Sequence, residues 1–472
     1  MSQGSFDPGS FRDRDSRVFH RGGKVYRALS REGLAHWEEA TATGLMPGLM
    51  RQGKVVRTTR LPEGSVVGPK GDWVAYLEHE SIPFISYAYE WCFSMLKDAA
   101  LLHLDLLESA LIDGFILKDA SPFNVQWSGH QPIFVDVGSF QKCRAGSTWV
   151  GYRQFCQMFL YPLLLQAYKG TPFQPYLRAH LDGIPVQDLA GTLCLRDYLR
   201  PGVVTHVFLQ RLLENRYERR AGDVGDDLRA AGFHSELIRT NVRALRRLIE
   251  RLDGSPGRSA WGNYVQEHSY TERDQAGKAG FVSKVAGSRR WRLVWDLGSN
   301  VGVYSRIAAQ HADYLVAMDL DPHVVEQLYR QARREGSRSM LPLVVNLSNP
   351  SPGLGWRGRE RRTLWDRGAP DLTLCLALIH HLVIAGNTPM REVVDWLGSL
   401  GTSLIIEFVR KEDPMVQRLL RNKTDQYWDY EEGHFERCLA ESFEIAERRA
   451  LESGHRTLYY ARPRSTTPSG GA

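Results

Sequence analysis

The stretch that decides the fold of the C-terminal half is Val294-Trp295-Asp296-Leu297-Gly298-Ser299-Asn300-Val301-Gly302. Its apolar first part predicts a buried strand, and its two glycines predict a tight turn before a helix from Val303 to His311. Because glycine has no Cβ, a ligand can lie against the backbone N–H groups at the start of that helix. The stretch therefore predicts a ligand site of the nucleotide-binding kind.

A second apolar strand, Tyr314–Met318, closes with Asp319. A carboxylate at that place can accept hydrogen bonds from both hydroxyls of a ribose, as in nucleotide-binding α/β sheets. The glycine spacing excludes two classes of site. A dinucleotide fingerprint needs glycine at the positions of Asn300 and Val303, and no P-loop sequence occurs in the chain. The sequence thus predicts a nucleoside-like cofactor.

Further strand-like segments follow. Asp371–Leu378 is a continuous apolar run, typical of a parallel strand covered on both faces, and it ends in Ile379-His380-His381. The next strand, Leu404–Val409, carries Glu407, and Thr388-Pro389 before it predicts the start of a helix. Two last segments predict an antiparallel pair, namely Phe443–Ala446 and Thr457–Tyr460.

The residues from Asp296 to Gly302 form the motif Asp-x-Gly-x-x-x-Gly. This motif and the order of the predicted strands resemble those of the class I S-adenosylmethionine-dependent methyltransferases, over about Trp261 to Pro463. The resemblance implies an α/β fold with a doubly wound, mostly parallel seven-stranded sheet, and S-adenosyl-L-methionine as cofactor. It implies these cofactor contacts: Asp296, Gly298, Ser299, Asn300, Gly302, Asp319, Leu320, Asn346 and Leu347. Two positions depart from the family pattern. Asn300 replaces a middle glycine, and Asn346, in the predicted strand Leu343–Leu347, stands where an acidic residue often contacts adenine.

The chemistry implied by this resemblance asks little of the protein. The sulfonium already activates its methyl group, so the site mainly aligns the acceptor and excludes water. A hydroxyl acceptor gains from a general base, and the pKa of histidine, about 6.5, suits that task. We predict that His380 or His381 is the base, with the alternative that both only hold a loop or line the cofactor pocket. Glu407 is predicted to orient the base or a substrate hydroxyl, and no metal site is predicted, because no third ligand accompanies the histidines.

The first half of the chain carries a second pattern. Asp119, then Asn124, then Asp136 in an Asp-x-Gly on the next predicted strand resemble the loops of protein-kinase-like and aminoglycoside-phosphotransferase-like enzymes. The resemblance implies that Asp119 would be the base and that Asn124 and Asp136 would hold Mg²⁺. Lys118 departs from that pattern, and Val25–Leu29 has neither a glycine-rich loop nor a V-A-I-K-type lysine beside it. We interpret this part as a degenerate kinase-like, α+β module for substrate recognition.

The length of 472 residues indicates more than one domain. We predict an α+β domain over 17–252, a Gly- and Pro-rich linker at 253–260 and the methyltransferase-like domain over 261–463, with disordered tails at 1–16 and 464–472. A net charge of +6 over this length does not indicate nucleic acid as a partner. The six cysteines lack metal-site spacing and fit a reducing cytoplasm, and the apolar run Met158–Leu165 is too short to span a bilayer.

The sequence as a whole predicts a cytoplasmic methyltransferase that modifies oxygen on a small molecule, glycan or lipid-linked acceptor, with nitrogen as an open alternative. Two other classes of function stay open. One is a kinase-like, ATP-dependent phosphotransferase, and the other is a non-catalytic scaffold that binds S-adenosylmethionine.

Overall fold

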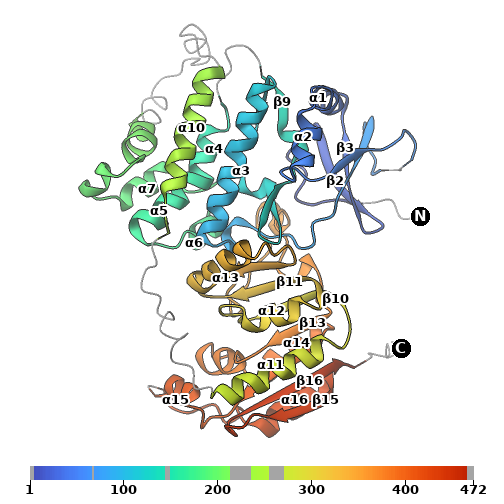
Figure 1. Ribbon diagram of the computed structural model, residues 1–472, viewed down its shortest axis with the longest axis vertical. Helices are drawn as coiled ribbons and strands as arrows, with labels where there is room; N and C mark the ends of the chain where they lie inside the picture. Colours follow the sequence, from blue (N-terminus) through green and yellow to red (C-terminus); the bar gives the residue numbers. More distant parts are fainter. Residues whose placement is uncertain are drawn as a thin grey trace. The chain divides into compact units, whose positions relative to one another are not determined.

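A computed structural model of the chain describes residues 5–65, 68–143, 149–212, 235–254, 271–421 and 423–464. The chain forms two compact units (Figure 1). The first comprises Met1–Gly257 together with Gly353–Arg361, and the second comprises Arg258–Pro352 and Arg362–Ala472. The short segment Gly353–Arg361 is called the excursion below, because it interrupts the chain of the second unit. The prediction that 261–463 belongs to one domain is therefore wrong at the excursion.

The second unit is built on a seven-stranded mixed sheet with the order β12-β11-β10-β13-β14-β16-β15. Neighbouring strands from β12 to β14 are parallel, and β16 runs antiparallel to both β14 and β15. The predicted antiparallel pair at the end of the chain is thus confirmed. The strands are β10 (Trp291–Leu297), β11 (Ala312–Asp319), β12 (Met340–Val344), β13 (Leu372–Cys375), β14 (Ser403–Val409), β15 (Phe443–Ala450) and β16 (Arg456–Pro463).

The continuous apolar runs of the sequence become the central strands of this sheet, where both faces are covered. Residues of α11, α12 and α13 share one buried cluster with the strands, including Phe281, Ala308 and Leu328. Helix α13 begins at Pro322. The preceding residue, Asp321, caps the helix, because its side chain accepts a hydrogen bond from a backbone N–H of the first turn. The helices are α11 (Glu272–Ala286), α12 (Val303–Ala309), α13 (Pro322–Arg334), α14 (Met390–Ser399), α15 (Pro414–Leu420) and α16 (Glu432–Ser442).

The first unit opens with a five-stranded antiparallel sheet in the order β1-β2-β3-β5-β4. Its strands are β1 (Ser5–Phe6), β2 (Ser16–Arg21), β3 (Lys24–Leu29), β4 (Thr58–Arg60) and β5 (Ala75–His79). The predicted disordered tail 1–16 is wrong from Ser5 onward, because β1 pairs with β2. The physical reason is the Phe6 ring, which contacts the rings of Phe19 and Trp73 and lies under the Arg17 guanidinium.

The rest of the first unit is mainly helical, around the long buried helix α3 (Phe93–Ile112). Helix α10 (Ser235–Arg251), which is basic in sequence, packs along α3, and its Arg243 forms an ion pair with Glu108. The other α-helices that the structure describes in this unit are α1 (Arg31–Ala42), α2 (Leu45–Arg51), α4 (Tyr152–Phe155), α5 (Tyr161–Lys169), α6 (Gln174–Ala179) and α7 (Val186–Thr192). Two hairpin-like pairs complete the unit, formed by β6 (Phe115–Leu117) with β9 (Phe140–Lys142) and by β7 (Val125–Ser128) with β8 (Gln131–Phe134).

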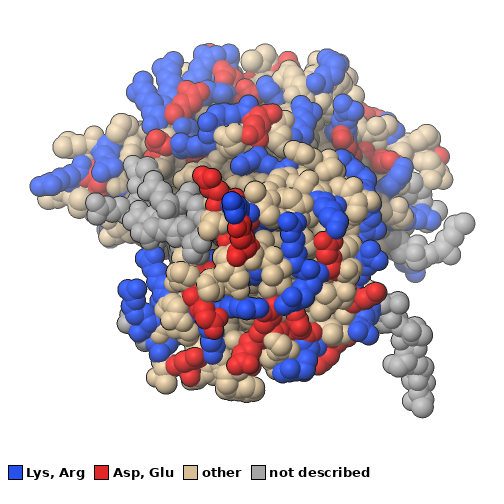
Figure 2. Space-filling view, turned by 60° about the horizontal axis from the view of Figure 1, so that its bottom comes forward, with Lys and Arg blue, Asp and Glu red and all other residues tan. Residues whose placement is uncertain are grey.

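Other predictions at this level fall partly outside the described residues. The predicted linker 253–260 is described only through Gly254, and the predicted tail 464–472 only at Arg464. Among the helices that the structure describes, none combines the length and the apolar character needed to cross a membrane. Basic and acidic side chains are interspersed over the face shown in Figure 2.

Candidate functional site

The candidate site lies at the carboxyl ends of β10 and β13 in the second unit. Strand β11, which follows β10 in the chain, pairs on one side of it, and β13 pairs on the other side. The strand order therefore reverses between β10 and β13, and open α/β sheets bind ligands in the crevice at such a point. Two turns flank it: the glycine turn, Gly298–Gly302 after β10, and the histidine turn, Ala377–His381 after β13.

The glycine turn needs left-handed backbone at three positions. Gly298, Asn300 and Gly302 have φ values of 73°, 48° and 75°. Asparagine tolerates this conformation, and the Asn300 side chain accepts a hydrogen bond from the Val301 N–H at 2.7 Å. At Gly302 a Cβ would lie 2.4 Å from the Leu328 Cδ1 of α13. The second glycine thus allows α12 and α13 to approach closely.

Asp319 joins the glycine turn to the end of β11. Its Oδ2 accepts a hydrogen bond from the Asn300 N–H at 2.8 Å, and its Oδ1 accepts one from the Asp321 N–H at 3.0 Å. Burial raises the pKa of the Asp319 carboxyl, against the effect of these backbone donors. The next side chain, Leu320, is 53% exposed. An acidic group and an accessible apolar side chain therefore stand together beside the turn.

Asn346 and Leu347 follow β12 at the same edge of the sheet. The predicted strand through Leu347 ends earlier, at Val344, and the Val345 N–H donates to the Asp319 carbonyl at 2.8 Å. The Asn346 Oδ1 accepts a hydrogen bond from the Ser348 N–H at 3.0 Å. Both Asn346 and Leu347 are half-buried.

Two polar side chains lie beneath the glycine turn. The buried Asp296 accepts a hydrogen bond from the Ser305 Oγ at 2.5 Å. Burial raises the pKa of the Asp296 carboxyl to about 6, although the Ser305 hydroxyl and Lys278 favour its charged form. The Oγ of Ser299 is buried and has no hydrogen-bond partner in the protein. A buried hydroxyl without a partner is costly, and this one lies in the turn that faces the crevice.

The histidine turn packs against the glycine turn. Ala377 has a φ of 51°, a conformation that is uncommon for a residue with a side chain and recurs at functional sites. A Cβ at Gly298 would lie 3.2 Å from the Leu378 Cδ1, so the two turns are close neighbours. His381 then begins a π-helical turn, His381–Ala385.

The two predicted bases differ in their surroundings. His380 is only 1% exposed, and neither of its ring nitrogens has a hydrogen-bond partner, whereas His381 is half-buried. Their ring centroids lie 4.3 Å apart. Burial lowers the pKa of both imidazoles, that of His381 to about 4, and the positive charge of Arg456 adds to this effect. Both rings are therefore neutral near pH 7.

Glu407 has other partners than the predicted ones. Its Oε2 lies 2.6 Å from the Lys278 Nζ and its Oε1 lies 3.2 Å from the Arg456 Nη1. The Arg456 Nε in turn lies 2.8 Å from the Asp413 Oδ2. All four side chains are buried.

Sequence reasoning missed three members of this group, Lys278, Arg456 and Asp413. A signal for Lys278 exists, because it shares the buried face of α11 with Phe281, Val282 and Val285 at helical spacing. A charged residue on the apolar face of a helix needs a buried partner. No comparable signal identifies that partner as Glu407.

The kinase-like residues of the first unit also come together. The Asn124 Nδ2 lies 3.4 Å from the Asp136 Oδ2, and burial and the Asp136 charge raise the pKa of Asp119. The structure adds Arg27 of β3, whose Nη1 lies 2.9 Å from the Asp136 Oδ1, and Lys118, which pairs with Asp13 at 3.1 Å. Within the described residues, no three His, Cys, Asp or Glu side chains are grouped as metal ligands would be. Cations of the protein itself thus neutralise part of this cluster.

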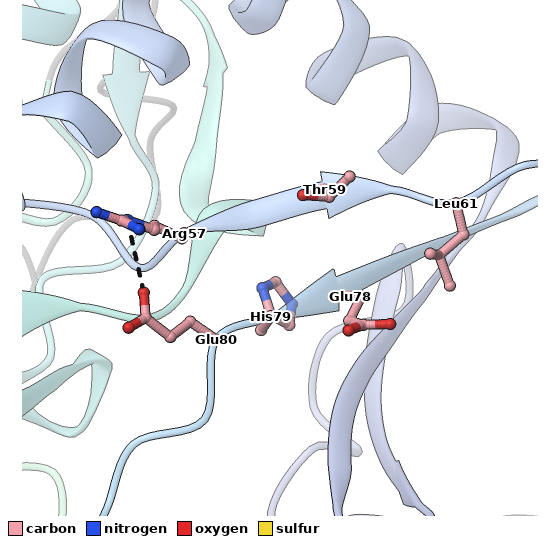
Figure 3. Close-up of a pocket in the computed structure, with 6 residues that line it drawn as sticks. All are labelled: Arg57, Thr59, Leu61, Glu78, His79 and Glu80. Carbon is pink, nitrogen blue, oxygen red and sulfur yellow. Dashed lines mark ion pairs between the residues drawn. The ribbon is translucent and has the colours of Figure 1, made fainter.

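A cavity of about 420 Å³ lies elsewhere in the first unit, at the β4–β5 edge of its sheet (Figure 3). It contains none of the predicted site residues. The Arg57 and Glu80 side chains at its rim form a long ion pair of 3.8 Å, and the His79 Nδ1 lies 2.8 Å from the Thr58 Oγ1. Its lining residues are Arg57, Thr59, Leu61, Glu78, His79 and Glu80.

Comparison with known proteins gives one relative over nearly the whole chain. The nodulation protein NoeA of Rhizobium meliloti (strain 1021) is 34% identical over 454 residues, which cover 96% of this chain and 94% of the relative. No protein-family model matches the chain.

Several solved structures resemble a part of the chain. One is the N-methyltransferase NodS of Bradyrhizobium japonicum WM9, which has also been solved with S-adenosyl-L-homocysteine. The match covers 41% of this chain and 98% of the NodS chain, with 13% sequence identity and a TM-score of 0.30. Another is magnesium protoporphyrin IX methyltransferase of Synechocystis PCC 6803, solved with the same ligand. The match covers 42% of this chain and 91% of that enzyme's chain, with 18% sequence identity and a TM-score of 0.30.

Proposed function

This chain belongs to the family of the nodulation protein NoeA, and we propose that it is an S-adenosylmethionine-dependent methyltransferase. The observation that carries the proposal is the contact between Asp319 and the glycine turn, which flanks the point where the strand order reverses. An acidic residue at the end of one strand and a turn of open backbone at the end of its neighbour suit an adenosine moiety. The sheet is then of the doubly wound type, with the antiparallel β16 inserted beside β14.

The residues present fit this cofactor. The two carboxylate oxygens of Asp319 accept backbone hydrogen bonds from Asn300 and Asp321 and keep acceptor capacity for ribose hydroxyls. The exposed side chain of Leu320 offers apolar contact to the adenine ring, and Asn346 can bind its polar edge. The unpartnered hydroxyl of Ser299 is available to the methionine carboxylate, and Asp296 supports the turn from below. S-adenosyl-L-methionine, when bound, supplies an electrophilic methyl group on its sulfonium.

The histidine turn is proposed to serve the methyl acceptor. His381 is half-buried and neutral, so its imidazole can accept the proton of a hydroxyl as the acceptor reacts. His380 lies beneath it and holds the ring in place through their contact. Both carboxylate oxygens of Glu407 form ion pairs, with Lys278 and with Arg456. Glu407 is therefore proposed to act on the acceptor through these partners and not by direct contact. The acceptor proposed is oxygen on a small molecule, glycan or lipid-linked molecule.

The cofactor assignment is tested by replacing Asp319 with alanine. Charged hydrogen bonds of this kind contribute about 1.5–3 kcal/mol each, so Asp319→Ala is expected to weaken the binding of S-adenosylhomocysteine by at least about tenfold. Calorimetric titration of wild type and variant measures this directly. Equal affinities, with both proteins folded by circular dichroism, would remove the ribose assignment.

The role of the histidine turn is tested by His381→Asn. A general base contributes about 10²–10⁴-fold, so the rate of labelled-methyl transfer should fall within that range while S-adenosylhomocysteine binds as in wild type. The assay uses the cell-extract fraction that the wild-type protein labels. Transfer at the wild-type rate would assign His381 to a structural role in the loop.

A phosphotransferase activity in the first unit is the second candidate. It is favoured by the convergence of Asp119, Asn124 and Asp136, and it is opposed by the ion pair of Asp136 with Arg27. Mg²⁺-dependent ATP turnover that disappears in Asp136→Ala would support this activity. Tight binding of S-adenosylhomocysteine without transfer or turnover would instead support the scaffold interpretation.

A further inference from the structure

A chain of buried polar contacts runs from the cofactor side of the proposed site to the acceptor side. On the cofactor side, the Tyr304 ring of α12 lies under the Lys278 Nζ, 4.6 Å from its centroid. Lys278 binds Glu407 at 2.6 Å, and Glu407 binds Arg456 at 3.2 Å. Tyr304 is half-buried, and burial raises the pKa of its hydroxyl, an effect to which the Glu407 charge adds.

The two ends of this chain lie at the two turns that flank the crevice. Tyr304 follows Gly302 by two residues, and its neighbour Ser305 binds Asp296 under the glycine turn. At the other end, Glu407 follows Ile406 of β14, which pairs with Cys375 at the end of β13, two residues before the histidine turn. Lys278 of α11 therefore contacts two residues, Tyr304 in the helix that leaves the glycine turn and Glu407 beside the strand end that leads into the histidine turn.

We propose that Lys278 is a positioning residue, which fixes the glycine turn and the histidine turn relative to each other through Tyr304 and Glu407. The inference rests on the proposed function, because methyl transfer needs the acceptor atom aligned behind the methyl carbon. A small relative movement of the two turns would misplace these atoms. Lys278 touches neither cofactor nor acceptor in this role.

A purely structural role makes a different prediction, and paired replacement separates the two. Removal of one partner from a buried ion pair destabilises a protein, whereas replacement of both by neutral groups often does not. Lys278→Met/Glu407→Gln removes one positive and one negative charge, and it leaves Arg456 paired with Asp413. If the pair only stabilises the fold, restored stability should restore the turns as well.

The test is amide hydrogen exchange on the full chain without ligand. In the double variant we expect a melting temperature near that of wild type, but exchange about tenfold faster in peptides covering 298–304 and 377–382. Exchange in β10 and β11 should not change. The matched control is Lys284→Met, which removes an exposed lysine of the same helix that pairs with Glu447, and it should alter neither turn.

Wild-type exchange in both turns of a folded double variant would overturn the proposal. Tyr304→Leu provides a second test that buries no lone charge. It should loosen 298–304 and leave 377–382 unchanged, and wild-type exchange at 298–304 would equally count against the role of Lys278. Titration with S-adenosylhomocysteine is a separate measurement, so loss of cofactor binding in the wild type would contradict the proposed function without affecting the exchange result.

Discussion

At the scale of single residues, Asp296 gives the second unit a pH dependence of known sign. Its pKa in the folded protein is about 6, against a usual value of 3.8, because burial disfavours the charged form. The folded protein therefore binds more protons than the unfolded chain between those values, and stability falls as the pH rises from about 4 to about 6. Asp296→Asn keeps an acceptor for the Ser305 hydroxyl but cannot ionise.

The prediction concerns the difference in unfolding free energy between wild type and Asp296→Asn. This difference should shift by about 2 kcal/mol in favour of the variant between pH 4 and pH 7. Urea denaturation at four pH values across that range measures it. Curves that stay parallel would show that the carboxyl of Asp296 is charged throughout.

Gly302 supports a second prediction at this scale. Gly302→Ala introduces a Cβ 2.4 Å from Leu328 and also strains a φ of 75°. Overpacking and a left-handed side chain together should cost about 2–4 kcal/mol of stability, measured by denaturant unfolding. Gly336→Ala is the matched control, because it has a φ of 66° with no atom within 4 Å of the new Cβ. It should cost only about 1–2 kcal/mol, and equal losses in both variants would argue against close packing of α12 on α13.

At the scale of elements, runs of apolar residues in the sequence predicted the strands that form the centre of the sheet. The run Trp291–Leu297 is a strand because its apolar side chains are covered on both faces, and Asp319 reaches the glycine turn because adjacent parallel strands end at one edge. The strand predicted to continue through Leu347 is too long at its end, and the reason is again the apolar pattern. Apolarity continues beyond the last ladder hydrogen bonds, so the sequence does not mark the end at Val344.

Contacts between elements far apart in the chain could not be predicted from the sequence. Lys278 and Glu407 are 129 positions apart, and nothing in either segment specifies the other as a partner. The polar composition of 1–16 suggested disorder, but a single aromatic residue, Phe6, anchors β1 in the sheet. Asn124 and Asp136 of the kinase-like pattern lie at hydrogen-bond distance, whereas the sequence does not indicate Arg27, the ion-pair partner of Asp136, because it comes from another strand.

At the scale of the whole molecule, the excursion makes the division of the chain discontinuous. Within the first unit, Leu354 and Arg361 form an isolated bridge, and Glu360 binds Arg12 at 2.7 Å. The Arg361 guanidinium lies 3.9 Å from the centroid of the Phe123 ring. A Gly- and Arg-rich segment would ordinarily be interpreted as a solvated loop, so its place in the first unit depends on these three contacts.

The contact between Gly9 and the excursion offers a test of this arrangement. A Cβ at Gly9 would lie 2.6 Å from the Glu360 carbonyl oxygen, and a backbone atom cannot move aside as a side-chain tip can. Gly9→Ala should therefore displace the excursion, destabilise the first unit by about 1–3 kcal/mol and increase trypsin cleavage after Arg361. Gly48→Ala in α2 meets no atom within 4 Å and should leave cleavage unchanged. If Gly9→Ala leaves both stability and cleavage at the wild-type level, the excursion is not held against the first unit, because a fixed carbonyl at that distance leaves no space for the added methyl group.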